Sequence, residues 1–238
     1  MKTLVLGASG ATGKLVVKQL MKKNISTRIL VRESAVLPEE IAGNPFVETV
    51  RGNVHELNPA EMNDLMQNCN VVISCLGHNV SLKGMFGHPR NLVVDALRNV
   101  SEAIRKSTEK KVKIILMSTT AFTNSFSGEK NSIGERIILS LLLFLLPPHR
   151  DNVRAARFLI NEIGKEDEKI EWIAVRPDTL IDNNVESEYE ICEHPVRSPI
   201  FDAGKTSRIN VSHFMAELVT DEGLWKKFLF KTPVLYNK

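Results

Sequence analysis

The residues best suited to chemistry lie near the amino terminus, in the stretch GASGATGK at positions 7–14. Its glycines are spaced G-x-x-G-x-x-G, at positions 7, 10 and 13. Glycine lets a backbone turn sharply and approach an anion closely, and the free amides at the start of a helix point at that anion. The stretch therefore predicts a loop that holds phosphate groups, with a plain strand-to-helix turn as the alternative.

The residues on either side of this loop indicate which phosphates it could hold. An apolar run, Thr3–Leu6, precedes it, and a helical pattern of apolar residues that includes Leu15 and Leu20 follows it. A triphosphate loop of the form G-x-x-x-x-G-K-[ST] would need glycine at position 8 and serine or threonine at position 15, where the chain has Ala8 and Leu15. The context therefore favours the pyrophosphate of a dinucleotide.

Residues at the end of the second expected strand, Thr27–Val31, bear on which dinucleotide binds. A site that prefers NAD usually has aspartate or glutamate there, which accepts a hydrogen bond from the ribose 2′-hydroxyl. Here the strand ends in Arg32, followed by Glu33 and Ser34. A guanidinium forms charge-assisted hydrogen bonds with a 2′-phosphate. We therefore expect NADP as the cofactor in preference to NAD.

The elements that must position these residues alternate regularly along the chain. Six short runs in the sequence are almost entirely apolar and rich in β-branched residues, which is typical of parallel strands covered on both faces. Helical spacing lies between them, for example over Asn91–Arg105 and over Ala60–Met66 after an Asn58-Pro59 start. We expect a doubly wound parallel α/β sheet, a Rossmann fold. Its strands are expected at Thr3–Leu6, Thr27–Val31, Phe46–Val50, Val71–Leu76, Val112–Met117 and Ile170–Val175.

The last quarter of the chain departs from this alternation. A polar segment, Asp182–Pro199, precedes a helix expected over His213–Asp221 with Ser212 as its cap, and a short strand over Pro233–Tyr236. We expect one domain over residues 1–238, in which residues 181–238 largely form a small substrate lobe beside the strand ends.

Composition excludes several classes of function. The net charge of +3 is spread along 238 residues, so the sequence indicates no nucleic-acid partner. Three cysteines without a C-x-x-C pair and six histidines without a metal-binding spacing predict a reduced, cytoplasmic protein with no metal. The apolar stretch 137–146 would rise about 15 Å as a helix, half of a hydrocarbon core of about 30 Å. It cannot span a membrane, and it is expected to be a core helix, a wall for an apolar substrate or a self-association face.

Beyond the loop, short motifs in order and spacing give the chain a family resemblance. They are VRES (31–34), GNV (52–54), VVISCLG (71–77), MSTTAF (117–122), AVRPDTL (174–180) and SRINVSHFM (207–215). With these motifs the chain resembles, nearly end to end, the atypical short-chain dehydrogenase/reductases of the NmrA-like group, and most closely their flavin and biliverdin reductase branch.

The resemblance implies a cofactor-binding role for residues throughout the chain. Where Asn53 stands the family more often has aspartate; an amide keeps an acceptor and adds a donor. The implied contacts are Gly7, Ser9, Gly10, Ala11, Thr12 and Gly13 around the pyrophosphate; Arg32 and Ser34 at the 2′-phosphate; Asn53 and Val54 beside the adenine; Cys75, Leu76 and Gly77 along the ribose and phosphate; Thr119 and Thr120 near the nicotinamide ribose; and Pro177 and Thr179 beside the nicotinamide.

The acid–base pair of most short-chain dehydrogenases, Tyr-x-x-x-Lys, is missing. Tyr189 is followed four residues later by Glu193, and Tyr236 lies two residues from the carboxyl end. Ordinary alcohol–carbonyl chemistry is therefore disfavoured, but hydride transfer to a conjugated acceptor is not, because solvent can supply its proton. Ser118 and Thr120 could donate to an acceptor oxygen, or bond only to backbone.

Other side chains could meet the substrate. Phe122 and Phe126 offer stacking surface for a planar ring, and His149 and Arg150 could meet an acidic group. Asp151 is expected to cap a helix over Asn152–Ile163. His78 and His88 follow the fourth strand, in a segment that lines the ligand crevice in doubly wound folds. Taken singly, each is interpreted as a surface histidine.

Two functions remain from this pattern. The first is an NADPH-dependent oxidoreductase of the atypical short-chain class, which passes hydride to a small planar acceptor such as a flavin, a quinone or a tetrapyrrole-like molecule. The second is a non-catalytic NAD(P)-sensing regulatory protein of NmrA type. Either is expected as a monomer or homodimer, and a sugar-nucleotide epimerase is disfavoured by the missing tyrosine–lysine pair.

Overall fold

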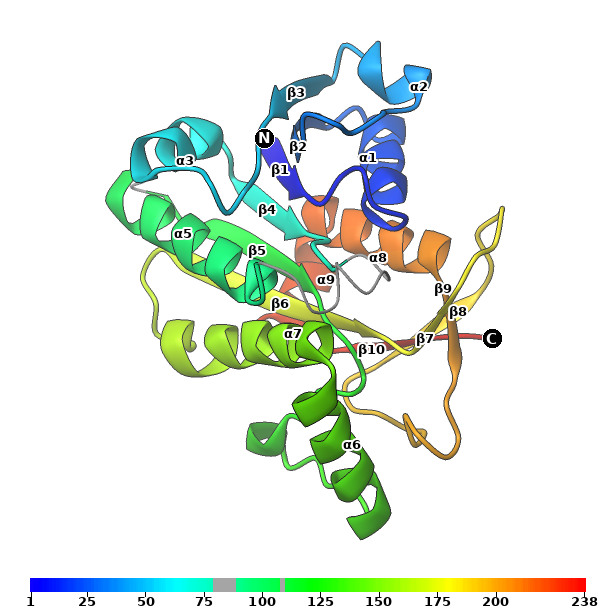
Figure 1. The fold of residues 1–238 in the computed structure, drawn as a ribbon. Helices are drawn as coiled ribbons and strands as arrows, with labels where there is room; N and C mark the ends of the chain where they lie inside the picture. Colours follow the sequence, from blue (N-terminus) through cyan, green and yellow to red (C-terminus); the bar gives the residue numbers. More distant parts are fainter. Residues whose placement is uncertain (79–88, 108–109) are drawn as a thin grey trace.

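The computed structural model describes residues 1–78, 89–107 and 110–238 (Figure 1). His88 lies outside the described residues. In the described part of the chain a central sheet of eight strands has the order β3-β2-β1-β4-β5-β6-β10-β8. All neighbours pair in parallel except β10 and β8. The strands are β1 Lys2–Leu6, β2 Ser26–Val31, β3 Val47–Arg51, β4 Val71–Ser74, β5 Val112–Met117, β6 Ile170–Pro177, β8 Tyr189–Cys192 and β10 Val234–Asn237.

This order confirms the doubly wound Rossmann sheet expected from the sequence. Strand order reverses between β1 and β4, where the chain crosses from one face of the sheet to the other. In such folds ligands bind in the crevice outside the carboxyl ends of the strands at this switch point. The topology therefore places the glycine-rich loop, which follows β1, at the position where a ligand is expected.

Helices cover both faces of the sheet (Figure 1). One layer holds α1 (Gly13–Lys22), α8 (Arg208–Thr220) and α9 (Glu222–Phe228) over a core that includes Val5, Ile29 and Ile73. The other holds α3 (Pro59–Met66), α5 (Leu92–Ser107) and α7 (Pro147–Phe158) over a core that includes Leu4 and Val72. The alternate residues of each strand therefore bury apolar side chains on opposite faces, which explains the continuous apolar runs.

The remaining described elements are short or peripheral. A second sheet pairs β7 with β9 in parallel. The bounds of all these remaining elements are α2 Glu39–Ala42, the 3₁₀ turn Ser125–Ser127, α6 Ile133–Leu145, the π-helical end of α7 at Leu159–Ile163, β7 Thr179–Ile181 and β9 Lys205–Ser207.

Helix starts agree with the sequence in one case and differ in another. Asn58 caps α3, as expected. Its side chain accepts hydrogen bonds from the backbone amides of Ala60 and Glu61, and the Glu61 carboxylate accepts one from the backbone amide of Asn58. The expected Ser212 cap of α8 is wrong, because Ser207 caps that helix through the amide of Asn210. Ser212 lies inside α8, and its hydroxyl donates to a carbonyl of the preceding turn.

The start of α7 also differs from the expected one. The helix begins at Pro147, because prolines fit the first turn, where amide donors are not needed. Asp151 therefore lies inside α7. The expectation that it caps this helix is wrong. Its carboxylate accepts instead from the amides of Val93 and Val94, at the start of α5. Asp151 thus caps a neighbouring helix.

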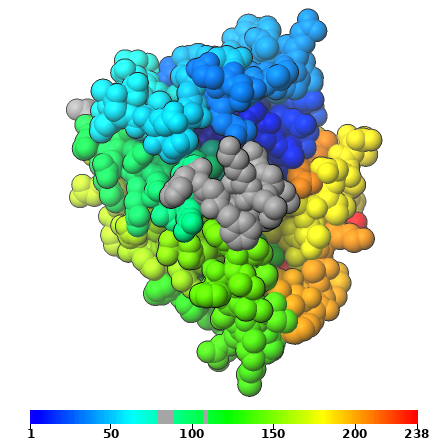
Figure 2. Space-filling view, viewed as in Figure 1, coloured from blue at the N-terminus to red at the C-terminus, as the bar shows by residue number. Residues whose placement is uncertain are grey.

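The apolar helix α6 projects from the lower end of the molecule (Figure 2). Ser132 and Glu135 form a capping box that starts it. Within α6 only Glu135 and Leu139 are buried, so the core-helix interpretation of residues 137–146 is wrong. Its exposed large apolar residues are Ile133, Ile137, Leu141, Phe144 and Leu145. No helix in the described parts of the chain has the length and apolar character needed to cross a bilayer.

A buried ion pair joins the end of β6 to the loop that follows β5. Arg176 is fully buried and donates to both carboxylate oxygens of Glu129, at 2.8 and 2.6 Å. It also donates to the carbonyls of Phe122 and Thr232. Burial alone would raise the pKa of Glu129, but the hydrogen bonds and charge of Arg176 hold this pKa below its ordinary value.

We predict that Glu129→Gln lowers the free energy of unfolding at pH 7 by about 3–5 kcal/mol, because it leaves a buried guanidinium without its counter-charge. Since the folded pKa of Glu129 is depressed, the carboxylate stabilises the fold above its unfolded pKa of about 4.5 and loses this effect as pH falls through the folded value. Urea unfolding at pH 7 and pH 4 measures both effects.

The control is Glu166→Gln, at an exposed position without an ion pair among the described residues. Equal unfolding free energies for Glu129→Gln and the wild type at pH 7 would contradict this account.

Candidate nucleotide site

A cleft of about 510 Å³ lies at the carboxyl ends of β1, β2, β3 and β4. Backbone from the glycine-rich loop forms its middle, and the ends of the neighbouring strands form its two sides. Its lining residues are Leu6, Gly7, Ser9, Gly10, Ala11, Thr12, Leu30, Val31, Arg32, Gly52, Asn53, Val54, His55, Cys75, Leu76, Gly77, His78, Pro89, Leu92, Met117, Leu180 and Arg208. The volume lies within the range of small-molecule and cofactor sites, about 300–1,000 Å³.

The glycines of the loop are required by close backbone contacts. Gly7 has φ +77°, and a Cβ there would come within 2.6 Å of the carbonyl oxygen of Cys75. A Cβ on Gly13 would overlap the carbonyl oxygen of Gly7. The amide of Gly10 donates to that same carbonyl at 3.0 Å and closes the turn. Side chains at positions 7 and 13 would therefore push the loop out of this shape.

The loop presents unpaired donors to the cleft. Among the described residues the amides of Ala11 and Thr12 have no hydrogen-bond acceptor. They lie at the start of α1, whose first turn carries no acidic side chain. Helix dipole and free amides together favour an anion at this position. The geometry therefore fits the diphosphate bridge of a dinucleotide.

The side of the cleft at β2 and β3 carries positive charge. Arg32 lines it and forms no ion pair within the described residues. The guanidinium of Arg51 donates to the carbonyl of Glu33 at 2.9 Å and so supports the loop that carries Arg32. The side-chain amide nitrogen of Asn53 donates a hydrogen bond to the Glu56 carboxylate, so the side-chain carbonyl oxygen of Asn53 can still accept one.

The opposite side of the cleft is built from the end of β4. Cys75 is buried, and burial raises the pKa of its thiol to about 12, so it forms a neutral wall. His78 also lines the cleft, and its Nε2 lies 2.9 Å from Oδ2 of Asp151. Its side chain is only 5% exposed, so the surface-histidine interpretation is wrong.

The structure brings together most, but not all, of the residues expected at the cofactor. Gly13 lies behind the loop, and Ser34 is exposed on the segment after β2. Thr119, Pro177 and Thr179 are not among the residues that line the cleft. The assignment of the whole set of expected residues, these five included, to cofactor binding stays a prediction.

The two expected catalytic hydroxyls lie outside the cleft lining. Ser118 is buried, and its Oγ has no hydrogen-bond partner among the described residues. Thr120 follows β5, and its hydroxyl donates to Asp178 at 3.4 Å. Burial raises the pKa of Asp178 despite this contact and two backbone amides.

The expected substrate residues divide between two places. Phe122 and Thr120 line a second pocket of about 460 Å³, between the loop after β5 and the segment around His194. His149 lies at the start of α7, and burial lowers the pKa of its imidazole. Its Nε2 is buried without a partner in the described part of the chain. Phe126 is exposed.

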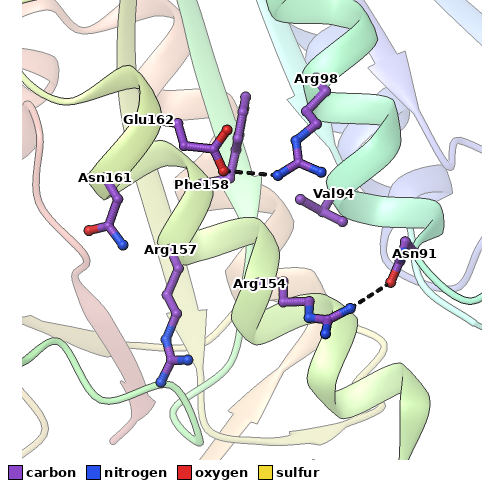
Figure 3. Close-up of a pocket in the computed structure, with 8 residues that line it drawn as sticks. All are labelled: Asn91, Val94, Arg98, Arg154, Arg157, Phe158, Asn161 and Glu162. Atoms are coloured by element: carbon purple, nitrogen blue, oxygen red, sulfur yellow. Dashed lines mark hydrogen bonds and ion pairs between the residues drawn. The ribbon is translucent and has the colours of Figure 1, made fainter.

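A third pocket, of about 230 Å³, lies between α5 and α7 and is lined by charged side chains (Figure 3). Arg154 donates to Asn91, and Arg98 pairs with Glu162 (Figure 3). Arg157 extends away from both of these contacts (Figure 3). The guanidinium groups do not converge on one point, so this pocket is not a candidate site.

Sequence reasoning missed the place of Arg208 in the cleft and the support that Arg51 gives to the loop carrying Arg32, and it preferred a surface position for His78. Arg51 ends β3 opposite Val31 of β2, a register that strand spacing alone did not give. Arg208 lines the cleft because α8 begins at this residue, earlier than expected, and its guanidinium forms an ion pair with Asp182. The partner of His78 lies 73 residues away in the sequence, and no local pattern signals such a contact.

Comparisons with known proteins agree with this fold. Similar solved structures include a short-chain dehydrogenase/reductase from Veillonella parvula in complex with NADP (TM-score 0.70, 16% identity, 99% of this chain and 94% of that one). A second is ChuY, an anaerobilin reductase from Escherichia coli (TM-score 0.69, 15% identity, 100% of this chain and 97% of that one). A third is a protein from Streptococcus pneumoniae assigned as an NADH-flavin reductase (TM-score 0.67, 12% identity, 100% of both chains). Among curated protein sequences, none matches this chain.

The fold and the cleft define the class: a Rossmann-type α/β protein with a dinucleotide-shaped site at the switch point of its sheet. The model of the NAD(P)H-binding family matches residues 7–222. The chain belongs to this family. The expected NAD(P)H-binding family is confirmed, and the likeness to short-chain reductases of known structure is confirmed for the fold.

We predict that Gly13→Ala weakens binding of NADPH and NADH alike, by at least about tenfold, because the new methyl group displaces the loop from its anion-binding shape. Calorimetric titration measures the loss, and far-UV circular dichroism confirms that the variant is folded. Gly43→Ala is the matched control, since its Cβ meets only an ordinary contact at 3.5 Å. Unchanged affinity in a folded Gly13→Ala protein would show that the loop does not hold the diphosphate.

Proposed function

We propose that the protein is an NADPH-dependent oxidoreductase that transfers hydride to a conjugated planar acceptor, such as a flavin, a quinone or a tetrapyrrole-like molecule. The observation that carries the proposal is the cleft itself: a diphosphate cradle at its middle, and strand ends on both sides that match the two halves of a dinucleotide. The reductases among similar structures support the same class of chemistry.

The sheet order supports the assignment of the two halves. With the diphosphate at the loop after β1, the adenosine half would lie over β2 and β3, which contribute Arg32, Asn53 and Val54. The nicotinamide half would lie over β4 and β5, which contribute Leu76, His78 and Met117. A reduced nicotinamide supplies the hydride, and the protein orients it and excludes water.

The two tyrosines support an acceptor other than a simple alcohol or ketone. The hydroxyl of Tyr189 is hydrogen-bonded to His213, and burial, with help from Glu217 and Glu186, raises its pKa to about 12. Tyr236 is buried in β10, and burial raises its pKa as well. Neither tyrosine lines the cleft. Neither is placed to act as the tyrosine of a Tyr-x-x-x-Lys pair.

A preference for NADP is supported by Arg32. Its guanidinium lines the adenosine side of the cleft and has no carboxylate partner in the described residues, so a ribose 2′-phosphate would provide one. Arg51 fixes the backbone of the same loop through the carbonyl of Glu33. Glu33 is exposed and does not line the cleft.

A second candidate function is an NAD(P)-sensing regulatory protein, and the exposed apolar face of α6 favours it. Ile133, Ile137 and Phe144 are each more than 60% exposed on this helix. Apolar patches of this kind mark interaction sites in soluble proteins. Such a protein would bind the dinucleotide tightly without turning it over.

We predict that purified protein oxidises NADPH with at least one acceptor from a panel of flavins, quinones and linear tetrapyrroles. The loss of absorbance of the reduced nicotinamide measures the reaction, and the same panel without protein is the control. Tight NADPH binding with no turnover on any acceptor would overturn the reductase proposal and favour the sensor.

We predict that Arg32→Ala weakens NADPH binding by about 10- to 100-fold, because hydrogen bonds to a charged group contribute about 1.5–3 kcal/mol each. NADH binding should change much less, since NADH has no 2′-phosphate. Calorimetry with both nucleotides gives the comparison, and Arg157→Ala, an exposed arginine outside the cleft, is the control. An equal loss for both nucleotides would refute the 2′-phosphate assignment.

A further inference from the structure

A buried histidine–carboxylate pair lies at the wall of the nucleotide cleft. Nε2 of His78 and Oδ2 of Asp151 are 2.9 Å apart, and their side chains are 5% and 0% exposed. The contact joins the segment after β4 to the inside of α7. Nothing in the glycine-rich loop or the 2′-phosphate site requires this pair.

The carboxylate of Asp151 is fixed from a second direction. Its Oδ2 also accepts from the amide of Val93 at 2.8 Å, and its Oδ1 accepts from the amide of Val94 at 3.2 Å. No lysine or arginine forms an ion pair with Asp151 in the described part of the chain. His78 is therefore the one side chain there that can meet this buried carboxylate as a cation.

The pair also fixes how His78 can act. A carboxylate that accepts from one imidazole nitrogen sets the tautomer and offsets the charge of the imidazolium. With Nε2 bound to Asp151, Nδ1 is the nitrogen left for a ligand in the cleft that His78 lines. This arrangement suits an imidazole that is fixed by the Asp151 carboxylate and donates a proton from Nδ1.

The position of His78 matches the reacting half of the cleft. It follows β4, on the side of the glycine-rich loop opposite Arg32 and Asn53. If the diphosphate lies at that loop, the nicotinamide and the acceptor beside it lie over β4 and β5. His78 would then stand next to the reacting atoms.

Other ionisable groups that line the cleft do not compete for this role. Arg32 and Arg208 remain cationic, and Cys75 remains a neutral thiol because burial raises its pKa to about 12. His55 lines the adenosine side and is 3.3 Å from Glu56. From α7, the group that faces His78 is Asp151 itself.

We propose that His78, held by Asp151, is the catalytic acid of the reductase reaction; this rests on the function proposed above. Reduction of the acceptor adds one hydride and one proton. The hydride and its two electrons come from NADPH, which is oxidised to NADP⁺. The N–H bond at Nδ1 of the doubly protonated His78 breaks to give the proton to the reduced acceptor, which leaves the neutral imidazole with its proton on Nε2. Solvent then reprotonates the imidazole, and Asp151 is the positioning residue.

The first test needs no turnover. In ¹⁵N NMR spectra of the nucleotide-free protein, neutral His78 should carry its proton on Nε2, and Asp151→Asn should change that signal. Calorimetry should give His78→Gln an NADPH affinity within about threefold of the wild type. A neutral His78 protonated on Nδ1 would contradict the proposed geometry.

The second test is kinetic. General acid catalysis contributes about 10²- to 10⁴-fold, so His78→Gln should lower kcat by that factor with little change in the KM for NADPH. The pH dependence of kcat/KM attributed to an essential acid should disappear in this variant. Asp151→Asn should lower kcat less and shift the profile. His213→Gln, on α8 and away from the cleft, is the control.

Each contrary outcome has a distinct meaning. Weaker NADPH binding with unchanged kcat would make His78 a cofactor ligand and overturn its role as the acid. An unchanged kcat and pH profile would mean that solvent supplies the proton, and would overturn this inference while leaving the reductase function intact. Absence of turnover by the wild-type protein on every acceptor would refute the reductase function itself.

Discussion

The site depends on one constraint, the closeness of the backbone at Gly7 and Gly13. Because neither position carries a side chain, the turn after β1 folds onto itself and against the carbonyl of Cys75. The amides of Ala11 and Thr12, at the positive end of α1, have no acceptor among the described residues. The rest of the sheet then provides two walls, an arginine-bearing one at β2 and β3 and a histidine-bearing one at β4.

The second wall is held in place by Asp151, whose carboxylate satisfies two amides at the start of α5 and one nitrogen of His78. A buried carboxylate is costly unless it is fully hydrogen-bonded. Its position in α7 therefore links this helix to the start of α5 and to the segment after β4. The same contacts that complete the packing of α5 on α7 thus orient the imidazole, so stability and the proposed proton transfer share one side chain.

The sequence predicted the parts of this protein that local patterns specify. The strands and the glycine-rich turn could be predicted from β-branched runs and from three regularly spaced glycines, since both depend on neighbours a few residues apart. The cap at Ser207, the role of Asp151 and the burial of His78 could not, because each depends on tertiary contacts or on where a helix begins. The sequence left the exposure of α6 open between a core helix, a substrate wall and a self-association face, since an apolar stretch does not reveal which of its faces finds a partner.

The most direct test of the central claim is a calorimetric titration of the wild-type protein with NADPH and with NADH at physiological ionic strength. A diphosphate cradle at the start of α1 predicts one saturable site per chain, filled by NADPH at lower concentration than by NADH. If neither nucleotide binds at millimolar concentration, the cleft is not a dinucleotide site, and the account built on it is wrong.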